Sequence, residues 1–112
     1  MARIEYNKLI RDRVKEKIEG AGDTCEVRIV TDPLELAEEL RKKIVEEAGE
    51  LASAEGREDF LSEYADLMVV LDALTKMMEL TEADIKVAIE ENLTKKGVYN
   101  SKHFLVWAES KN

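Results

Sequence analysis

Two long segments of the chain carry apolar residues at every third or fourth position, and only a short polar stretch at 55–57 separates them. In the first segment, about 34–54, the apolar row is Leu36, Leu40, Ile44, Leu51 and Ala54. In the second, about 58–78, it is Phe60, Tyr64, Leu67, Leu71, Leu74 and Met78. This spacing is that of one face of an α-helix, and a short loop makes consecutive helices pack as antiparallel neighbours. The sequence therefore predicts a helical hairpin.

The second of these segments carries another row at the same spacing. Its members are Glu63, Asp66, Val70, Ala73 and Met77. A helix with apolar residues on two faces exposes more apolar surface than one small chain readily covers. We therefore expect a homodimer or homotetramer, in which pairing across a two-fold axis completes the bundle.

Shorter helices are expected on either side of the hairpin. Apolar residues at every fourth position (Tyr6, Ile10, Val14 and Ile18) predict a helix from about 6 to 19, which the glycines at 20–22 end. Thr81 with Asp84 forms a capping box that opens a helix at about 82–96, with Gly97 as its stop. Asp32 and Pro33 are typical N-cap and first-turn residues for the helix at 34–54.

Two short segments have the pattern of β-strands. Residues 25–30 alternate apolar and charged side chains, and residues 103–107 are rich in strand formers. The expected fold is thus all-α, a four-to-five-helix bundle in a single domain over 1–112, with a small two-stranded β element from 25–30 and 103–107. Five glycines and one proline in 112 residues fit long helices.

The charge and the cysteine content exclude several classes of protein. Seventeen Lys and Arg against 25 Asp and Glu give a net charge of −8, which opposes binding to a nucleic acid polymer. A single cysteine, Cys25, forms neither an internal disulfide nor a cysteine-based zinc site. The N-terminal residues are charged and no stretch approaches about 20 apolar residues, so we expect a cytoplasmic protein without a membrane segment.

Four carboxylates stand at positions where the two long helices should meet. Glu47 fills a place in the apolar row between Ile44 and Leu51, and Glu50 follows it by three residues. Glu63 and Asp66 have the same spacing. Residues three apart share a helix face, so antiparallel packing would bring both pairs together.

Converging carboxylates repel one another and resist burial, and a divalent cation removes both costs. An all-oxygen ligand set suits Mg²⁺ or Mn²⁺, whereas a di-iron bundle needs a histidine on its helices. The only histidine, His103, lies outside the predicted helices. The alternative is that these acids are ordinary solvated glutamates in a chain that has 25 acids.

These residues resemble the signature of the MazG-like all-α nucleoside triphosphate pyrophosphohydrolases. Glu46-Glu47-x-x-Glu50 and Glu63-x-x-Asp66 match the E-E-x-x-E and E-x-x-D segments of that family. Residues 6–14, YNKLIRDRV, are similar to the N-terminal K-L-[VI]-R-D-[KR]-[IV]-P motif of its phosphoribosyl-ATP pyrophosphatase-like branch, with Lys15 in place of the proline. The resemblance covers about 6–105.

The resemblance implies hydrolysis between the α and β phosphates of a nucleotide, giving a monophosphate and pyrophosphate. It assigns Mg²⁺ to Glu47, Glu50, Glu63 and Asp66, with Mn²⁺ as a possible substitute. The metal would neutralise polyphosphate charge and activate a water. Glu46 is the candidate catalytic residue that positions or deprotonates this water; the alternative is a plain surface glutamate.

An acidic protein that binds a polyphosphate needs cations besides the metal. Candidates for substrate binding are Lys8, Arg11 and Arg13 on the predicted first helix, and Asn92, Lys95 and Lys96 on the predicted last helix. At 96–99 the chain carries Lys where the family tends to have Arg, and lysine contacts phosphate as a point charge. Lys95 and Lys96 could instead stabilise the negative end of their helix, and Asn92 could be a hydrogen-bonded core amide.

Two other functions are compatible with the sequence. The first is the pyrophosphatase reaction on phosphoribosyl-ATP in histidine biosynthesis, because a branch motif does not fix the substrate. The second is a catalytically silent helical interaction module. A module of that kind has no need to keep four acids at costly positions.

Overall fold

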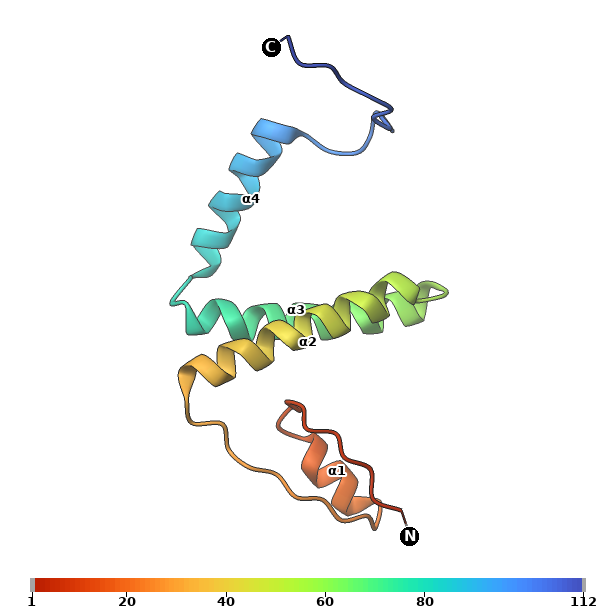
Figure 1. Ribbon diagram of the computed structural model, residues 1–112, viewed down its shortest axis with the longest axis vertical. Helices are drawn as coiled ribbons and strands as arrows, with labels where there is room; N and C mark the ends of the chain where they lie inside the picture. The colour runs from red at the N-terminus through yellow and green to blue at the C-terminus, as the bar shows by residue number, and fades with distance from the viewer. Residues whose placement is uncertain (1, 112) are drawn as a thin grey trace. The chain divides into compact units, whose positions relative to one another are not determined.

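The computed structural model describes residues 2–111, and its regular structure consists of helices (Figure 1). They are α1 (Val14–Gly20), α2 (Pro33–Ser53), α3 (Arg57–Met77) and α4 (Glu82–Lys96). The chain divides into two compact units, one reaching from the N-terminal end to Glu79 and the other beginning at Leu80. The expectation of an all-helical protein is confirmed. None of the described helices is long and apolar enough to cross a membrane.

Helices α2 and α3 form the predicted hairpin, each displaced from its expected bounds by a single residue. The carboxylate of Asp32 accepts a hydrogen bond from the Leu34 backbone N–H at 3.1 Å, and Pro33 occupies the first turn, where its missing N–H costs nothing. Gly56, with φ of 82°, makes the turn before α3. The Asp59 carboxylate accepts from the Glu55 N–H at 3.2 Å and ties the loop to α3.

The core lies between α2 and α3, which pack side by side (Figure 1). Its buried residues are Leu40, Val70 and Leu74, and the half-buried apolar residues packed on them are Leu9, Leu36, Ala37, Ile44, Leu67 and Ala73. Both apolar rows predicted on α3 therefore contribute to the core. Leu67 and Leu74 come from one row, and Val70 and Ala73 come from the other. Phe60 and Tyr64 of the first row are exposed.

The prediction of a helix from Tyr6 is wrong, since α1 begins only at Val14. Asn7 has φ of 46°, a left-handed conformation that an α-helix does not allow. Arg13 stands at the N-cap without a side-chain hydrogen bond. The side chains of Lys8 and Arg11 reach carboxylates on α2 and α3 instead of lining a helix face.

The predicted β element is also wrong: both 25–30 and 103–107 lie in the described part of the chain, and neither forms a strand there. A lone pair of short strands is only marginally stable in water, so alternation alone does not produce a ladder. Ile29 is exposed, and Arg28 makes a bidentate ion pair with Glu35 on α2 at 2.6 and 3.2 Å.

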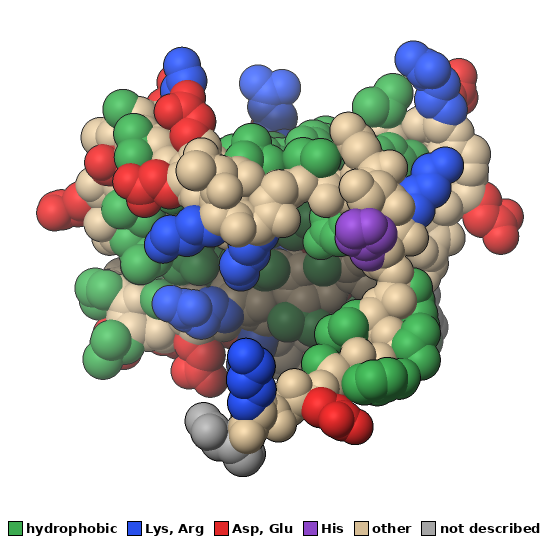
Figure 2. Space-filling view, turned by 90° about the horizontal axis from the view of Figure 1, so that it is seen from above, with side chains coloured by type: hydrophobic (Ala, Val, Ile, Leu, Met, Phe, Trp, Pro, Cys, Tyr) green, Lys and Arg blue, Asp and Glu red, His purple; other side chains and the backbone are tan. Residues whose placement is uncertain are grey.

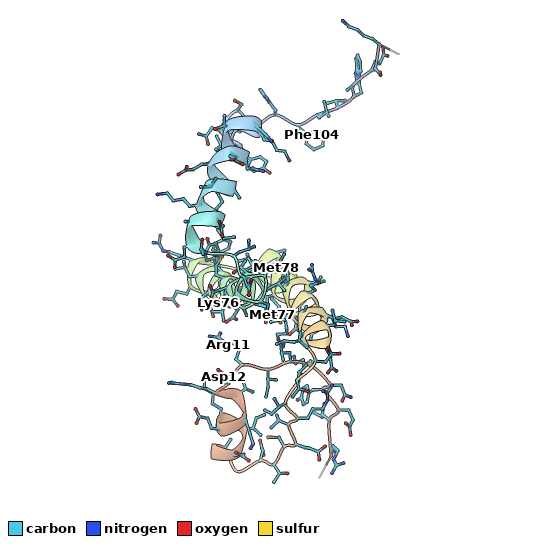
Figure 3. All side chains as sticks on the ribbon, turned by 90° about the vertical axis from the view of Figure 1, so that its left-hand side faces the viewer. Arg11, Asp12, Lys76, Met77, Met78 and Phe104 are labelled. Carbon is cyan, nitrogen blue, oxygen red and sulfur yellow. The ribbon has the colours of Figure 1, made fainter. Side chains whose placement is uncertain are left out.

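The unit that begins at Leu80 consists of α4 and the segment that follows it. The Thr81 hydroxyl accepts from the Asp84 N–H at 3.1 Å and the Asp84 carboxylate accepts from the Thr81 N–H at 2.8 Å, as the predicted capping box requires. Gly97, with φ of 76°, ends the helix. Every residue from 80 to 111 is exposed, including Phe104, whose side chain stands clear of its neighbours in Figure 3.

Candidate metal centre

Three of the four predicted ligands meet between α2 and α3. One carboxylate oxygen from each of Glu47, Glu50 and Glu63 lies within 4.8 Å of the others. Glu47 and Glu50 are one helical turn apart on α2, and the hairpin brings α3 alongside them. The predicted convergence of carboxylates from the two helices is therefore present for these three residues.

Two oxygens of this cluster are buried without compensation. Glu47 Oε2 and Glu63 Oε2 are shielded from solvent and have no hydrogen-bond partner among the residues that the structure describes. A desolvated, unpaired carboxylate oxygen is costly. Both residues fit a site in which a hard divalent cation supplies the missing partner.

The electrostatic environment of Glu47 also favours a bound cation. Its side chain is only 12% exposed. Burial raises the pKa of Glu47, and the neighbouring charges of Glu50 and Asp66 raise it further, against the opposing effect of Lys43. Glu47 is thus a carboxylate whose ionisation the protein alone stabilises poorly, and a bound cation would favour the ionised form.

Asp66 lies at the edge of the cluster. It is close enough to raise the pKa of Glu47, but it does not belong to the group of three converging oxygens. Its Oδ1 accepts from Arg11 Nη1 at 3.3 Å. The structure therefore gives Asp66 a protein cation as its partner.

Glu46, the candidate catalytic residue, lies between two lysines. Lys8 Nζ donates to its Oε1 at 3.3 Å, and Lys43 Nζ donates to the same oxygen at 3.4 Å. Burial would raise the pKa of Glu46, but these hydrogen bonds and the charges of both lysines outweigh burial, so that the pKa is lowered. Glu46 is consequently ionised at neutral pH.

Lys43 is a site residue that the sequence reasoning missed. It is 16% exposed, and its Nζ lies 3.4 Å from Glu46 Oε1 and 3.5 Å from Glu47 Oε1. Its position one turn before Glu47 was the available signal, since residues four apart share a helix face. A lysine held between two site carboxylates can contact an anionic ligand there.

A cavity of about 810 Å³ adjoins the carboxylates within the first unit. Its wall includes Glu47, Asp66 and four cations, which are Arg11, Arg13, Lys17 and Lys43. The apolar part of the wall comes from Leu36, Leu40, Val69, Val70, Ala73 and Met77 of the hairpin, with Leu9, Ile10 and Val14. Figure 3 shows Arg11 and Met77 close together, from the N-terminal segment and from α3. The cavity wall thus combines charged side chains, Asp12 among them, with apolar ones.

The N-terminal cations reach the site from coil. Lys8, Arg11 and Arg13 were expected on a helix, but all three precede α1. Lys8 and Arg11 pair with Glu46 and Asp66, and Arg13 lines the cavity. The structure therefore brings Lys8 and Arg11 to carboxylates of the site and Arg13 to the adjoining cavity, although none of the three is on a helix.

The remaining predicted residues belong to the second unit. Asn92 and Lys96 line a cavity of about 430 Å³ together with Leu93, Gly97, Val98 and Tyr99. Lys95 shares the last turn of α4 with Lys96 but does not line this cavity. The role of these three residues toward a nucleotide stays a prediction.

Comparison of the chain with protein-family models, with curated proteins and with solved structures gives no match.

Proposed function

We propose that the protein is a divalent-metal-dependent nucleotide pyrophosphohydrolase, which cleaves (deoxy)nucleoside triphosphates between the α and β phosphates and clears unwanted nucleotides. The observation that carries the proposal is the cluster of Glu47, Glu50 and Glu63, together with a cavity that Glu47 lines along with several cations. The motif resemblance described above supports the same reaction. Glu47, Glu50 and Glu63 would hold Mg²⁺ or Mn²⁺, with Asp66 at the edge.

When bound, the metal supplies neutralisation of phosphate charge and activation of a water. The residues of the chain do the rest. Arg11, Arg13 and Lys43 bind the polyphosphate oxygens, and Lys43 delivers its charge from a half-buried position between the carboxylates. The apolar wall of the cavity excludes water from the base or sugar.

Glu46 is suited to orient a water, because it is ionised and its second oxygen, Oε2, is not used by Lys8 or Lys43. Its lowered pKa makes it a weak base while both lysines are bound to it. When the phosphates of a substrate draw Lys43 away, the carboxylate becomes more basic. Substrate binding thus raises the basicity of Glu46, the proposed general base.

The position of the N-terminal motif is also compatible with phosphoribosyl-ATP as the substrate. Lys8 and Arg11, which carry the similarity to the phosphoribosyl-ATP pyrophosphatase-like branch, contact Glu46 and Asp66. The bond that is cleaved would be the same in phosphoribosyl-ATP. Only the fit of the remainder of the nucleotide would differ.

Product analysis tests the proposal. The protein is incubated with Mg²⁺ or Mn²⁺ and a panel of ribo-, deoxyribo- and modified triphosphates plus phosphoribosyl-ATP, and products are separated by anion exchange. Monophosphate with pyrophosphate is the expected result, and Glu47→Gln should abolish it. Glu38→Gln, an exposed change on the same helix, is the control that should keep activity.

Release of orthophosphate would refute cleavage between the α and β phosphates, and equal turnover by Glu47→Gln would refute the site assignment. A protein that neither binds Mn²⁺ nor turns over any of these nucleotides would instead be the helical interaction module.

A further inference from the structure

Asp66 is the predicted metal ligand that does not belong to the converging group of carboxylates. It follows Glu63 by one helical turn on the same face of α3, and its charge is close enough to Glu47 to oppose the ionisation of that residue. Its Oδ1, however, accepts a hydrogen bond from Arg11 Nη1 at 3.3 Å. Asp66 is therefore paired with a guanidinium of the same chain.

The pair of Arg11 and Asp66 is weaker than another arginine pair of the same unit. It consists of one N–O contact, and the two side chains are 61% and 38% exposed. Arg28, by contrast, holds Glu35 with both terminal nitrogens, at 2.6 and 3.2 Å, and bidentate geometry is what strengthens an arginine pair. Figure 2 shows Lys and Arg side chains at the surface, where water and salt compete for them. A single exposed contact of this kind contributes little free energy and is readily exchanged.

The segment that carries Arg11 is attached to the hairpin by other contacts as well. Leu9 packs on the core between α2 and α3. The Arg11 carbonyl accepts a hydrogen bond from the Val14 N–H at 3.1 Å, at the start of α1. Neither contact involves the guanidinium, which also lines the cavity. The Arg11 side chain can therefore leave Asp66 while its backbone stays in place.

We propose that Arg11 and the divalent metal are alternative partners of Asp66, so that metal binding releases the guanidinium into the cavity. The proposal rests on the metal site proposed above and concerns the regulation of that site. Without metal, Arg11 compensates the charge of Asp66. With metal, Asp66 joins Glu47, Glu50 and Glu63 as a ligand, and Arg11 is free to contact an anion such as a polyphosphate.

The relative strength of the two attractions favours this exchange. Mg²⁺ carries two charges and contacts a carboxylate oxygen at about 2.1 Å, whereas the guanidinium of Arg11 carries one charge and lies 3.3 Å from Asp66 Oδ1. By Coulomb's law, the attraction to the metal is about three times larger at the same dielectric constant. The metal and the guanidinium also repel each other, because both are cations. Arg11 is therefore the partner that leaves.

A different arrangement predicts the opposite effect of removing Arg11. If Asp66 bound the metal through Oδ2 and kept Arg11 on Oδ1, Arg11 would orient a ligand, and its loss would weaken metal binding. If the two cations compete for Asp66, the loss of Arg11 tightens metal binding. Competition is favoured by the structure, because Asp66 stays outside the converging group while Arg11 holds it.

Calorimetric titration of the full chain with Mn²⁺ tests the competition. Arg11→Gln should lower the dissociation constant of Mn²⁺ by about fivefold more than Arg13→Gln does. Arg13 is the matched control because it lines the same cavity without a carboxylate partner, so its variant measures the general effect of one lost positive charge. In an Asp66→Asn background, the advantage of Arg11→Gln over Arg13→Gln should disappear. Circular dichroism confirms that each variant is folded.

Chemical labelling of the wild type gives a readout that needs no substitution. Phenylglyoxal modifies accessible guanidinium groups, and peptide mass spectrometry gives the rate at each arginine. Saturation with Mn²⁺ should raise the rate at Arg11 by at least about twofold, because a weak pair is broken. Inorganic tripolyphosphate, added with Mn²⁺ kept in excess, should lower the rate again. Arg28, paired with Glu35, is the internal control and should keep its rate throughout.

The results separate the exchange from the metal site on which it rests. Weaker Mn²⁺ binding by Arg11→Gln, equal effects of Arg11→Gln and Arg13→Gln, or an advantage that persists in Asp66→Asn would overturn the exchange and leave the metal site in place. Labelling of Arg11 that ignores Mn²⁺ would do the same. A wild type that binds no Mn²⁺ would overturn both the metal site and the exchange.

Discussion

Replacing Glu47 with glutamine should have opposite effects on stability in the absence and presence of divalent metal. Without metal, Glu47→Gln removes a carboxylate charge whose side chain is 12% exposed and which Glu50 and Asp66 repel. Its Oε2 also has no hydrogen-bond partner among the described residues. The lost attraction to Lys43 at 3.5 Å offsets only part of this gain. We expect the metal-free variant to be more stable than the wild type by on the order of 1 kcal/mol, or about 4–8 °C in Tm.

With Mn²⁺ at a hundred times its dissociation constant, the wild type should gain about 2.7 kcal/mol, or roughly 10–20 °C. The variant lacks one of three converging ligands, so most of that gain should disappear. Differential scanning calorimetry of both proteins, with and without Mn²⁺, measures the four values. Glu38→Gln should behave as the wild type throughout. A metal-free Glu47→Gln that is less stable than the wild type, or that keeps the full Mn²⁺ shift, would refute the reasoning.

Three further predictions concern single residues. Lys43→Met should tighten Mn²⁺ binding in calorimetric titration, because a cation leaves the carboxylates, and should lower kcat/KM for a triphosphate by at least about tenfold; equal changes in Lys43→Arg would contradict a role for its charge. Leu74→Ala should lower the free energy of unfolding in urea by about 2–5 kcal/mol, whereas the exposed Ile29→Ala should stay within about 0.5 kcal/mol. The capping-box hydrogen bonds lower the pKa of Asp84 below 3.8, so the stability that its ionised form contributes is present above pH 3.8 and is lost as the pH falls through the lower folded-state pKa. The difference in stability between the wild type and Asp84→Asn should therefore vanish in strong acid, and a difference that persists there would argue against the cap.

The parts of the fold that local signals specify could be predicted from the sequence. Asp32, Pro33 and the Thr81–Asp84 box place helix starts by hydrogen bonds and dihedral angles within a few residues, and the apolar rows set the lengths of α2 and α3. The start of α1 could not be predicted. Periodicity at 6–19 does not reveal that Asn7 is left-handed, or that Lys8 and Arg11 are attracted to carboxylates distant in the sequence.

The part of the candidate site that could be predicted from the sequence is the residue that interrupts the apolar row of α2. Glu47 interrupts an apolar row, and that anomaly identified a residue with an uncompensated buried oxygen. Lys43 was missed because a lysine one turn from a glutamate is also typical of an exposed helix. The partner of Asp66 was missed because it comes from a segment whose conformation the pattern misjudged.

Helix α4 has no buried side chain, and its ends are fixed by a capping box and by Gly97. On its own, a helix of 15 residues is only marginally stable in water. Its caps then decide how much of the time it is folded. Any molecule that contacts α4 must supply the remaining ordering free energy, so its affinity should respond to Thr81 and Gly97 even though it touches neither residue.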